Sequence, residues 1–86
     1  MGSHNFITVT VRSFISPQES VERYELGRPF QIELPRGITL GELAERILSK
    51  NINQLGMMAV NGGVAKQNLV LSQGDRIDLY ALIDGG

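Results

Sequence analysis

A single strong helix signal lies near the middle of this 86-residue chain, between two groups of strand-like segments. Thr39 and Glu42 have the spacing of a capping box, in which each side chain accepts a hydrogen bond from the other residue's backbone amide. The apolar residues that follow recur at helical spacing: Leu40, Leu43, Ala44, Ile47 and Leu48. The pattern predicts a helix that ends near Lys50, has Asn51 as its left-handed stop and packs one face on a sheet.

Two strands are predicted before this helix. The segment from Phe6 to Phe14 alternates, and its apolar face carries Ile7, Val9 and Val11. A second alternating segment stops at Pro35 and carries Phe30, Ile32 and Leu34. We expect the two strands to pair antiparallel, with the polar stretch up to Gly27 as an exposed excursion between them.

Shorter strands are predicted after the helix. Met57 to Val60 form a brief apolar strand, in which Met57 and Met58 are interpreted as core side chains. Asn61-Gly62 follows it and is a strong hairpin-turn signal. Asp75 and Asp78 lie near a later turn and are interpreted as solvated residues rather than as a cation site. The final strand alternates at Ile77, Leu79 and Ala81.

Together these elements predict an α+β fold of the ubiquitin-like β-grasp type. One main helix would pack on one face of a mixed sheet of four to five strands, with the first and last strands side by side at its centre. We expect one domain over residues 5–82, because the length allows a single core. Residues 1–4 are interpreted as an expression-tag remnant and residues 83–86 as a flexible diglycine tail.

Composition excludes several classes of function. Eight Lys and Arg residues against nine Asp and Glu give a net charge of -1, which predicts no binding to nucleic acid or to anionic membranes. The chain has no cysteine, which excludes disulfides, thiolate metal sites and a cysteine nucleophile. Its one histidine, His4, lies in the tag-like segment. We therefore expect no metal site, no bound cofactor and no catalytic side chain, and the absence of a membrane span or secretion signal predicts a cytoplasmic protein.

Four stretches of the chain resemble the ubiquitin-like sulfur carriers of the MoaD and ThiS type. They are Glu33 to Leu43, Val60 to Gly62, Leu71 to Ile77, and the final Gly85-Gly86. The excursion from Phe14 to Gly27 resembles the longer first connection of molybdopterin-synthase small subunits and favours the MoaD branch.

The resemblance implies that Gly86 carries the chemistry. In such carriers an E1-like adenylating enzyme of the MoeB or ThiF type uses ATP to activate the terminal carboxylate, which becomes a thiocarboxylate. Gly85 and Gly86 would thread into the narrow site of that enzyme, since glycine allows close backbone approach. The sulfur would then pass to the large subunit of molybdopterin synthase, or to another acceptor enzyme, in molybdenum-cofactor biosynthesis.

Tyr80, Leu82, Ile83 and Asp84 precede the diglycine and are predicted to dock partners. For Leu82 the residues leave two interpretations open, an exposed docking residue or the last residue of the core. Three alternatives of function also stay open. The same terminus would serve a ubiquitin-like protein modifier or a carrier for thiazole and other sulfur metabolites, and the domain could instead be a non-covalent interaction module.

Overall fold

The computed structural model describes residues 5–15 and 26–82. The elements are β1 (Phe6–Ser13), β2 (Phe30–Pro35), α1 (Leu40–Leu48), the 3-10 helix η1 (Ser49–Gln54), β3 (Leu55–Val60), β4 (Gly63–Val64) and β5 (Arg76–Ala81). The tag-like residues 1–4, most of the predicted excursion at 16–25 and the tail at 83–86 lie outside the described residues.

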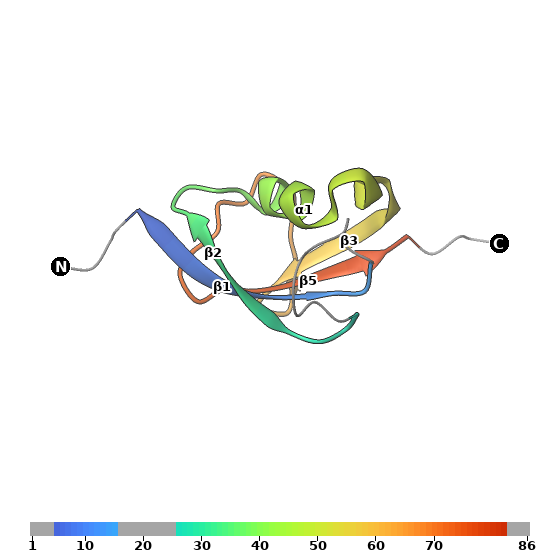
Figure 1. Ribbon diagram of the computed structural model, residues 1–86, viewed down its shortest axis with the longest axis horizontal. Helices are drawn as coiled ribbons and strands as arrows, with labels where there is room; N and C mark the ends of the chain where they lie inside the picture. Colours follow the sequence, from blue (N-terminus) through green and yellow to red (C-terminus); the bar gives the residue numbers. More distant parts are fainter. Residues whose placement is uncertain (1–4, 16–25, 83–86) are drawn as a thin grey trace.

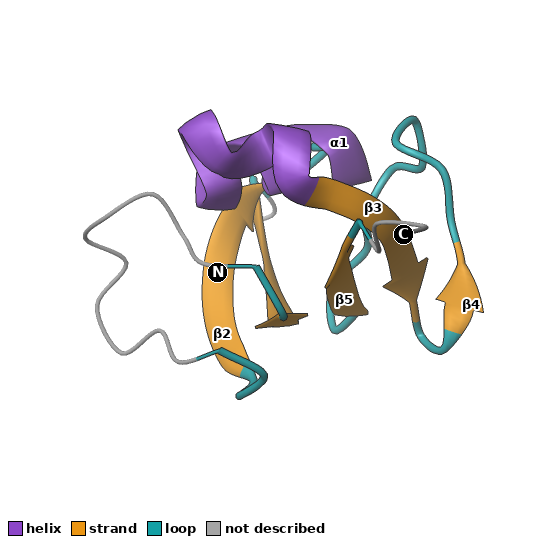
Figure 2. Cartoon of the chain, turned by 90° about the vertical axis from the view of Figure 1, so that its right-hand side faces the viewer, coloured by secondary structure: helices purple, strands orange, loops and turns teal. Residues whose placement is uncertain are grey.

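The five strands form one mixed sheet in the order β2-β1-β5-β3-β4. β1 and β5 pair parallel at its centre, whereas β1–β2, β3–β5 and β3–β4 pair antiparallel. Figures 1 and 2 show α1 and the 3-10 helix on one face of this sheet, and the described residues place no helix on the other face. The predicted α+β class, the single main helix and the central position of the first and last strands are confirmed.

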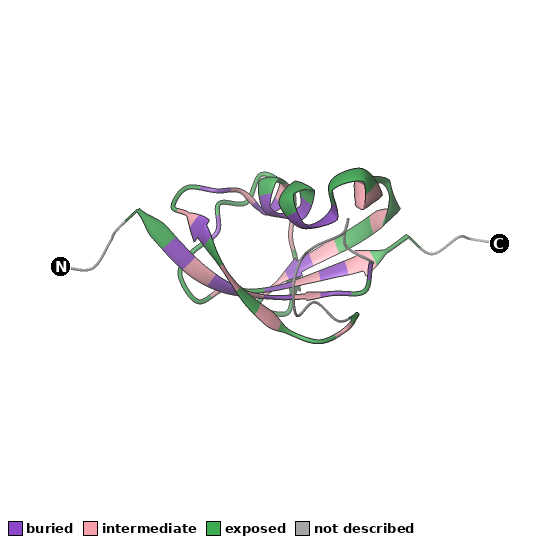
Figure 3. Ribbon diagram, in the orientation of Figure 1, coloured by how far each residue is buried: buried purple, intermediate pink, exposed green. Residues whose placement is uncertain are grey.

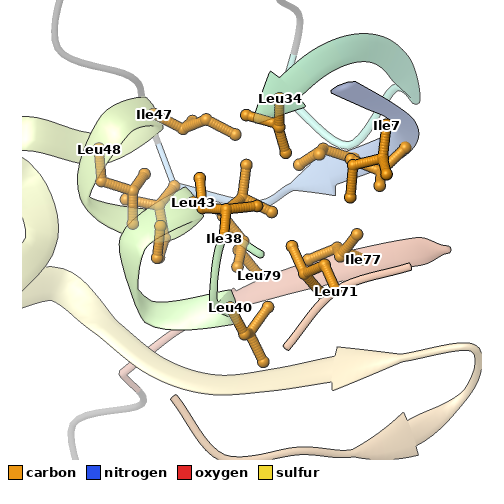
Figure 4. Close-up of a cluster of buried hydrophobic side chains, with 14 residues drawn as sticks. Ile7, Leu34, Ile38, Leu40, Leu43, Ile47, Leu48, Leu71, Ile77 and Leu79 are labelled. Carbon is orange, nitrogen blue, oxygen red and sulfur yellow. The ribbon is translucent and has the colours of Figure 1, made fainter. Parts of the chain in front are cut away.

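The core lies between α1 and the covered face of the sheet (Figure 4). β1 places alternate side chains there, and Figure 3 shows the buried and less buried residues alternating along it. All five apolar residues of the predicted helix stripe are buried. The other buried members of the core are Ile7, Val9, Val11, Ile15, Leu34, Ile38, Leu71, Ile77 and Leu79. Burying each leucine or isoleucine stabilises the fold by about 1.5–3 kcal/mol relative to exposure.

The start of α1 was predicted correctly, but its end was not. The capping box is present, because Thr39 Oγ1 accepts from the Glu42 amide at 3.2 Å and Glu42 Oε1 accepts from the Thr39 amide at 2.9 Å. The helix ends at Leu48, before the predicted Lys50, and the residue of positive φ that follows it is Ser49 (φ 49°, ψ -116°) rather than Asn51. A longer α-helix would place polar Asn51 one turn beyond Ile47, on the buried face. The 3-10 helix follows instead, and its Ile52 packs against the core.

The Asn61-Gly62 turn is confirmed. Both residues are left-handed, with φ of 52° and 87°, and Val60 pairs with Gly63 across a two-residue loop. The Asn61 side chain also ties the hairpin to the start of β5. Its Nδ2 donates to Asp75 Oδ1 at 3.0 Å, and its Oδ1 accepts from the Arg76 amide at 3.0 Å. The second carboxylate oxygen of Asp75 accepts from the Ser72 amide at 2.7 Å. Asp75 therefore joins the Asn61-Gly62 turn to the turn that precedes β5.

Candidate functional site

The candidate site begins where β5 ends. β5 runs through the centre of the sheet, and its last residue, Ala81, pairs with Leu55 at the start of β3 (Figure 1). The Leu82 amide then donates to the Gln54 carbonyl at 2.8 Å. The other predicted residues of this segment, Ile83, Asp84, Gly85 and Gly86, lie outside the described residues, so their predicted roles stay predictions.

Leu82 is not part of the core. Its side chain is 62% exposed, although its backbone is hydrogen-bonded, so the core-completing interpretation is wrong. A hollow of about 300 Å³ lies beside it, lined by Asn53, Gln54, Ala81 and Leu82. An exposed leucine next to a hollow is a surface that a partner could cover.

Met57 is also exposed, at 44%, which corrects its prediction as a core side chain. The reason is an irregularity in strand pairing. Leu55 pairs with Ala81 and Met57 with Tyr80, so Gly56 is an extra residue in β3, a β-bulge. Beyond the bulge Met58 pairs with Leu79 and packs against the core, while Met57 and Tyr80 turn to the uncovered face of the sheet.

An aromatic pair occupies the uncovered face beside this end of the sheet. The rings of Phe14 and Tyr80 are stacked, with centroids 5.3 Å apart and planes 8° from parallel. The Arg12 guanidinium lies 5.3 Å from the Phe14 ring centroid. Its Nε also donates to Asp78 Oδ1 at 3.0 Å. We call Arg12, Phe14, Met57, Asp78 and Tyr80 the open-face cluster.

The charges of the open-face cluster are paired. Hydrogen bonding to Asp78 and its negative charge raise the pKa of Arg12, so the guanidinium is charged at every physiological pH. Asp78 is thus the ion-pair partner of Arg12. Within residues 5–15 and 26–82, no group of three or more His, Asp or Glu side chains is placed to hold a metal ion.

Sequence reasoning found Tyr80 but missed Phe14 and Arg12 as its neighbours. Phe14 precedes the long connection to β2, whereas Tyr80 lies near the end of the chain. The two meet because β1 and β5 pair parallel, with Ser13 opposite Leu79. The alternation predicted for Phe6 to Phe14 was the available signal, since it places Arg12 on the face opposite Ile7, Val9 and Val11. It does not say which strand lies beside β1.

No α-helix in the described part of the chain is long and apolar enough to cross a membrane. No protein-family model matches the sequence, and a search of curated proteins finds no match.

Solved structures do match. A ubiquitin from Caldiarchaeum subterraneum has a TM-score of 0.62 at 13% identity, over 94% of this chain and 99% of that one. A putative molybdopterin converting factor, subunit 1, from Pyrococcus furiosus has a TM-score of 0.62 at 18% identity, over 90% of this chain and 99% of that one. A complex of subunits 1 and 2 of molybdopterin-converting factor from Helicobacter pylori has a TM-score of 0.55 at 24% identity, over 93% of this chain and 100% of that one. The chain therefore has the ubiquitin-like β-grasp fold, which these structures share with it.

Proposed function

We propose that this protein is a sulfur carrier whose Gly86 carboxylate is converted to a thiocarboxylate that donates sulfur, in the biosynthesis of molybdopterin. The observation that carries the proposal is the end of β5. The central strand of a ubiquitin-like sheet leads to an exposed apolar residue, Leu82, and the sequence then closes with Gly85-Gly86. The likeness to the molybdopterin converting factor subunit 1 of Pyrococcus furiosus supports the same function.

The chemistry needs a carboxylate from this chain and catalysts from its partners. A Gly86 carboxylate oxygen attacks the α-phosphorus of ATP, the bond to the β-phosphate oxygen breaks, and pyrophosphate leaves. A persulfide sulfur then attacks the carbonyl carbon of this acyl-adenylate and expels AMP. A thiol reductant cleaves the resulting S–S bond and leaves the thiocarboxylate. No cysteine or histidine of the carrier enters these steps, which fits a chain with no cysteine and with His4 as its one histidine.

Two partners follow from this scheme. The first is an E1-like adenylating enzyme that binds ATP and receives the terminus. The second is a sulfur acceptor, and the Helicobacter pylori complex of subunits 1 and 2 supports a large subunit of the same kind. We assign the protein to the cytoplasm, where ATP is available for such an activation. We assign its own part as substrate and docking surface rather than as enzyme.

Docking would use the end of β5 and the open-face cluster. Tyr80 and Leu82 shortly precede residues 83–86, and Leu82 is exposed. The Phe14–Tyr80 stack extends this apolar surface along the uncovered face of the sheet. Ile83 and Asp84 would continue this contact toward the diglycine. The Arg12–Asp78 ion pair borders the apolar surface, as polar groups commonly do at protein interfaces.

Intact-mass measurement tests the proposal directly. The protein is incubated with an E1-like enzyme, ATP and a persulfide donor, and a variant lacking Gly86 is the control. We expect a mass gain that matches the replacement of one oxygen by sulfur, and only in the full chain. An unchanged mass with every activating enzyme, together with stable partner binding by the truncated variant, would favour a non-covalent interaction module and overturn the proposal.

The likeness to the Caldiarchaeum subterraneum ubiquitin supports a second candidate, a protein modifier. It would use the same adenylate, but a lysine amine of a target protein would displace AMP to form an isopeptide bond. Lysine-linked adducts of this chain on other proteins, found by mass spectrometry, would favour the modifier over the carrier.

A further inference from the structure

Gly56 lies close to the backbone of Ala81 and Leu82, just before residues 83–86. A methyl group in place of its hydrogen would lie 2.9 Å from Leu82 Cα, 3.0 Å from the Leu82 nitrogen and 3.0 Å from the Ala81 carbonyl oxygen. All three are backbone atoms, which cannot swing away as the end of a side chain can. Any residue larger than glycine at this position must therefore displace the end of β5 or the start of β3.

The requirement for glycine here is one of space. Gly62 is left-handed, with φ of 87°, and favours glycine for its backbone angles. Gly56 is not among the residues of positive φ. It is the extra residue of the bulge between Leu55 and Met57, where the pairing of β3 with β5 shifts register. Its missing side chain lets the two backbones approach closely.

The Leu82 backbone is therefore positioned by two features of the segment around Leu55. Gly56 leaves it room to approach β3 closely, and the Gln54 carbonyl accepts a hydrogen bond from its amide at 2.8 Å. The Leu82 side chain itself is exposed and leaves the backbone position to these two contacts. We call Gly56 and the Gln54 carbonyl the backbone seat of Leu82.

We propose that Gly56 is a positioning residue for the activation of the carboxyl terminus. By holding the Leu82 backbone in place, Gly56 fixes where residues 83–86 begin relative to the open-face cluster. This inference rests on the proposed function. Gly86 lies only four residues beyond Leu82, so a shift of Leu82 would also shift a tail that is drawn into a narrow enzyme site. A misplacement of about 1 Å, even one caused far from the chemistry, can cost about 100-fold in rate.

The test compares Gly56→Ala with Gly63→Ala in ATP–pyrophosphate exchange by the E1-like enzyme. Gly63 is a matched control, because a methyl group there would meet only the Val60 carbonyl oxygen, at an ordinary 3.8 Å. For Gly56→Ala we expect kcat to fall by about tenfold or more. KM should change by a smaller factor than kcat, since the substitution alters no side chain of the open-face cluster or of Leu82. Gly63→Ala should match the wild type in both constants.

A second pair of variants tests the seat from the other side. Leu82→Pro removes the amide that donates to Gln54, whereas Leu82→Ala removes only the exposed side chain. We expect Leu82→Pro to lower kcat below that of Leu82→Ala. This pair decides the question if Gly56→Ala does not fold, which circular dichroism would reveal. The Leu82 amide provides a readout without any enzyme, since its hydrogen exchange should be faster in Gly56→Ala than in Gly63→Ala.

The outcomes separate the inference from the function on which it rests. If the wild type shows no Gly86-dependent exchange of pyrophosphate, the proposed function fails, and the hydrogen exchange of the Leu82 amide still tests the seat. If the wild type is activated and folded Gly56→Ala keeps its kcat, the positioning role is wrong. A loss confined to KM would also overturn it, because Gly56 would then act through docking.

Discussion

Leu82→Ala should weaken docking of the activating enzyme while leaving the fold intact. The side chain is 62% exposed, so a partner that covers it would bury most of its apolar surface. Full burial of a leucine side chain is worth about 1.5–3 kcal/mol, and covering the exposed fraction would contribute roughly 1–2 kcal/mol. This free energy corresponds to a roughly 5- to 30-fold higher KM if Leu82 reaches a partner pocket.

The assay is Gly86-dependent ATP–pyrophosphate exchange, with KM for the carrier as the quantity compared. Urea unfolding gives the stability of the same samples. We expect Leu82→Ala to lower the free energy of unfolding by less than about 1 kcal/mol, because the smaller part of the side chain is buried. A raised KM with nearly unchanged stability would locate the loss in docking.

Leu69→Ala is the matched control. Leu69 is 39% exposed, and it lies away from Leu82. Its carbonyl accepts from the Leu40 amide at the start of α1, whereas the Leu82 amide donates to the Gln54 carbonyl beyond the end of that helix. Its removal should cost more stability and leave KM unchanged. If KM for Leu82→Ala stayed within about twofold of the wild type, Leu82 would not dock and the reasoning from its exposure would be refuted.

Three further predictions concern the fold that presents this surface. In urea unfolding, Asn61→Ala should be less stable than Asn61→Gly by about 1 kcal/mol. Both variants lose the side-chain hydrogen bonds, but only alanine is strained at a φ of 52°. Equal stabilities would contradict this account of the turn. Leu43→Ala should lower the free energy of unfolding by about 2–5 kcal/mol, since Leu43 is fully buried between α1 and the sheet, and a loss below about 1 kcal/mol would mean that the helix packs differently. Hydrogen bonds from the Thr39 amide and hydroxyl lower the pKa of Glu42 below its ordinary 4.5. Ionised Glu42 therefore stabilises the fold fully above pH 4.5, and this stabilisation is lost as the pH falls through the lower pKa of the folded state. The stability difference between the wild type and Glu42→Gln should therefore shrink on acidification through this range, and a difference independent of pH would argue against the capping role.

The elements that the sequence predicted well are those with short-range causes. A capping box spans four residues, and the Asn-Gly turn depends on two left-handed residues, so Thr39 to Glu42 and Asn61-Gly62 were readable without knowledge of their surroundings. The alternation of Ile7, Val9 and Val11 likewise identified which face of β1 is buried. Each of these signals lies within a few residues along the chain.

The errors arose where distant segments compete for the same space. α1 ends at Leu48 and a 3-10 helix follows from Ser49 to Gln54, a change that the helical spacing of the apolar residues does not reveal. Met57 was assigned to the core because the bulge at Gly56 has no strong local signal, and its position follows from the pairing of β3 with β5.

The sequence by itself determined the β-grasp order of elements and the candidate reactive group, Gly86, in a chain that has no cysteine. Tertiary structure decided which surface accompanies that group. Phe14 and Tyr80 stack because the parallel pairing of β1 and β5 joins two strands from opposite ends of the chain. Gly56 reaches Leu82 because a bulge brings two backbones into contact. Both contacts are non-local, and residue pattern specifies which side of a strand is buried but not which strand lies beside it.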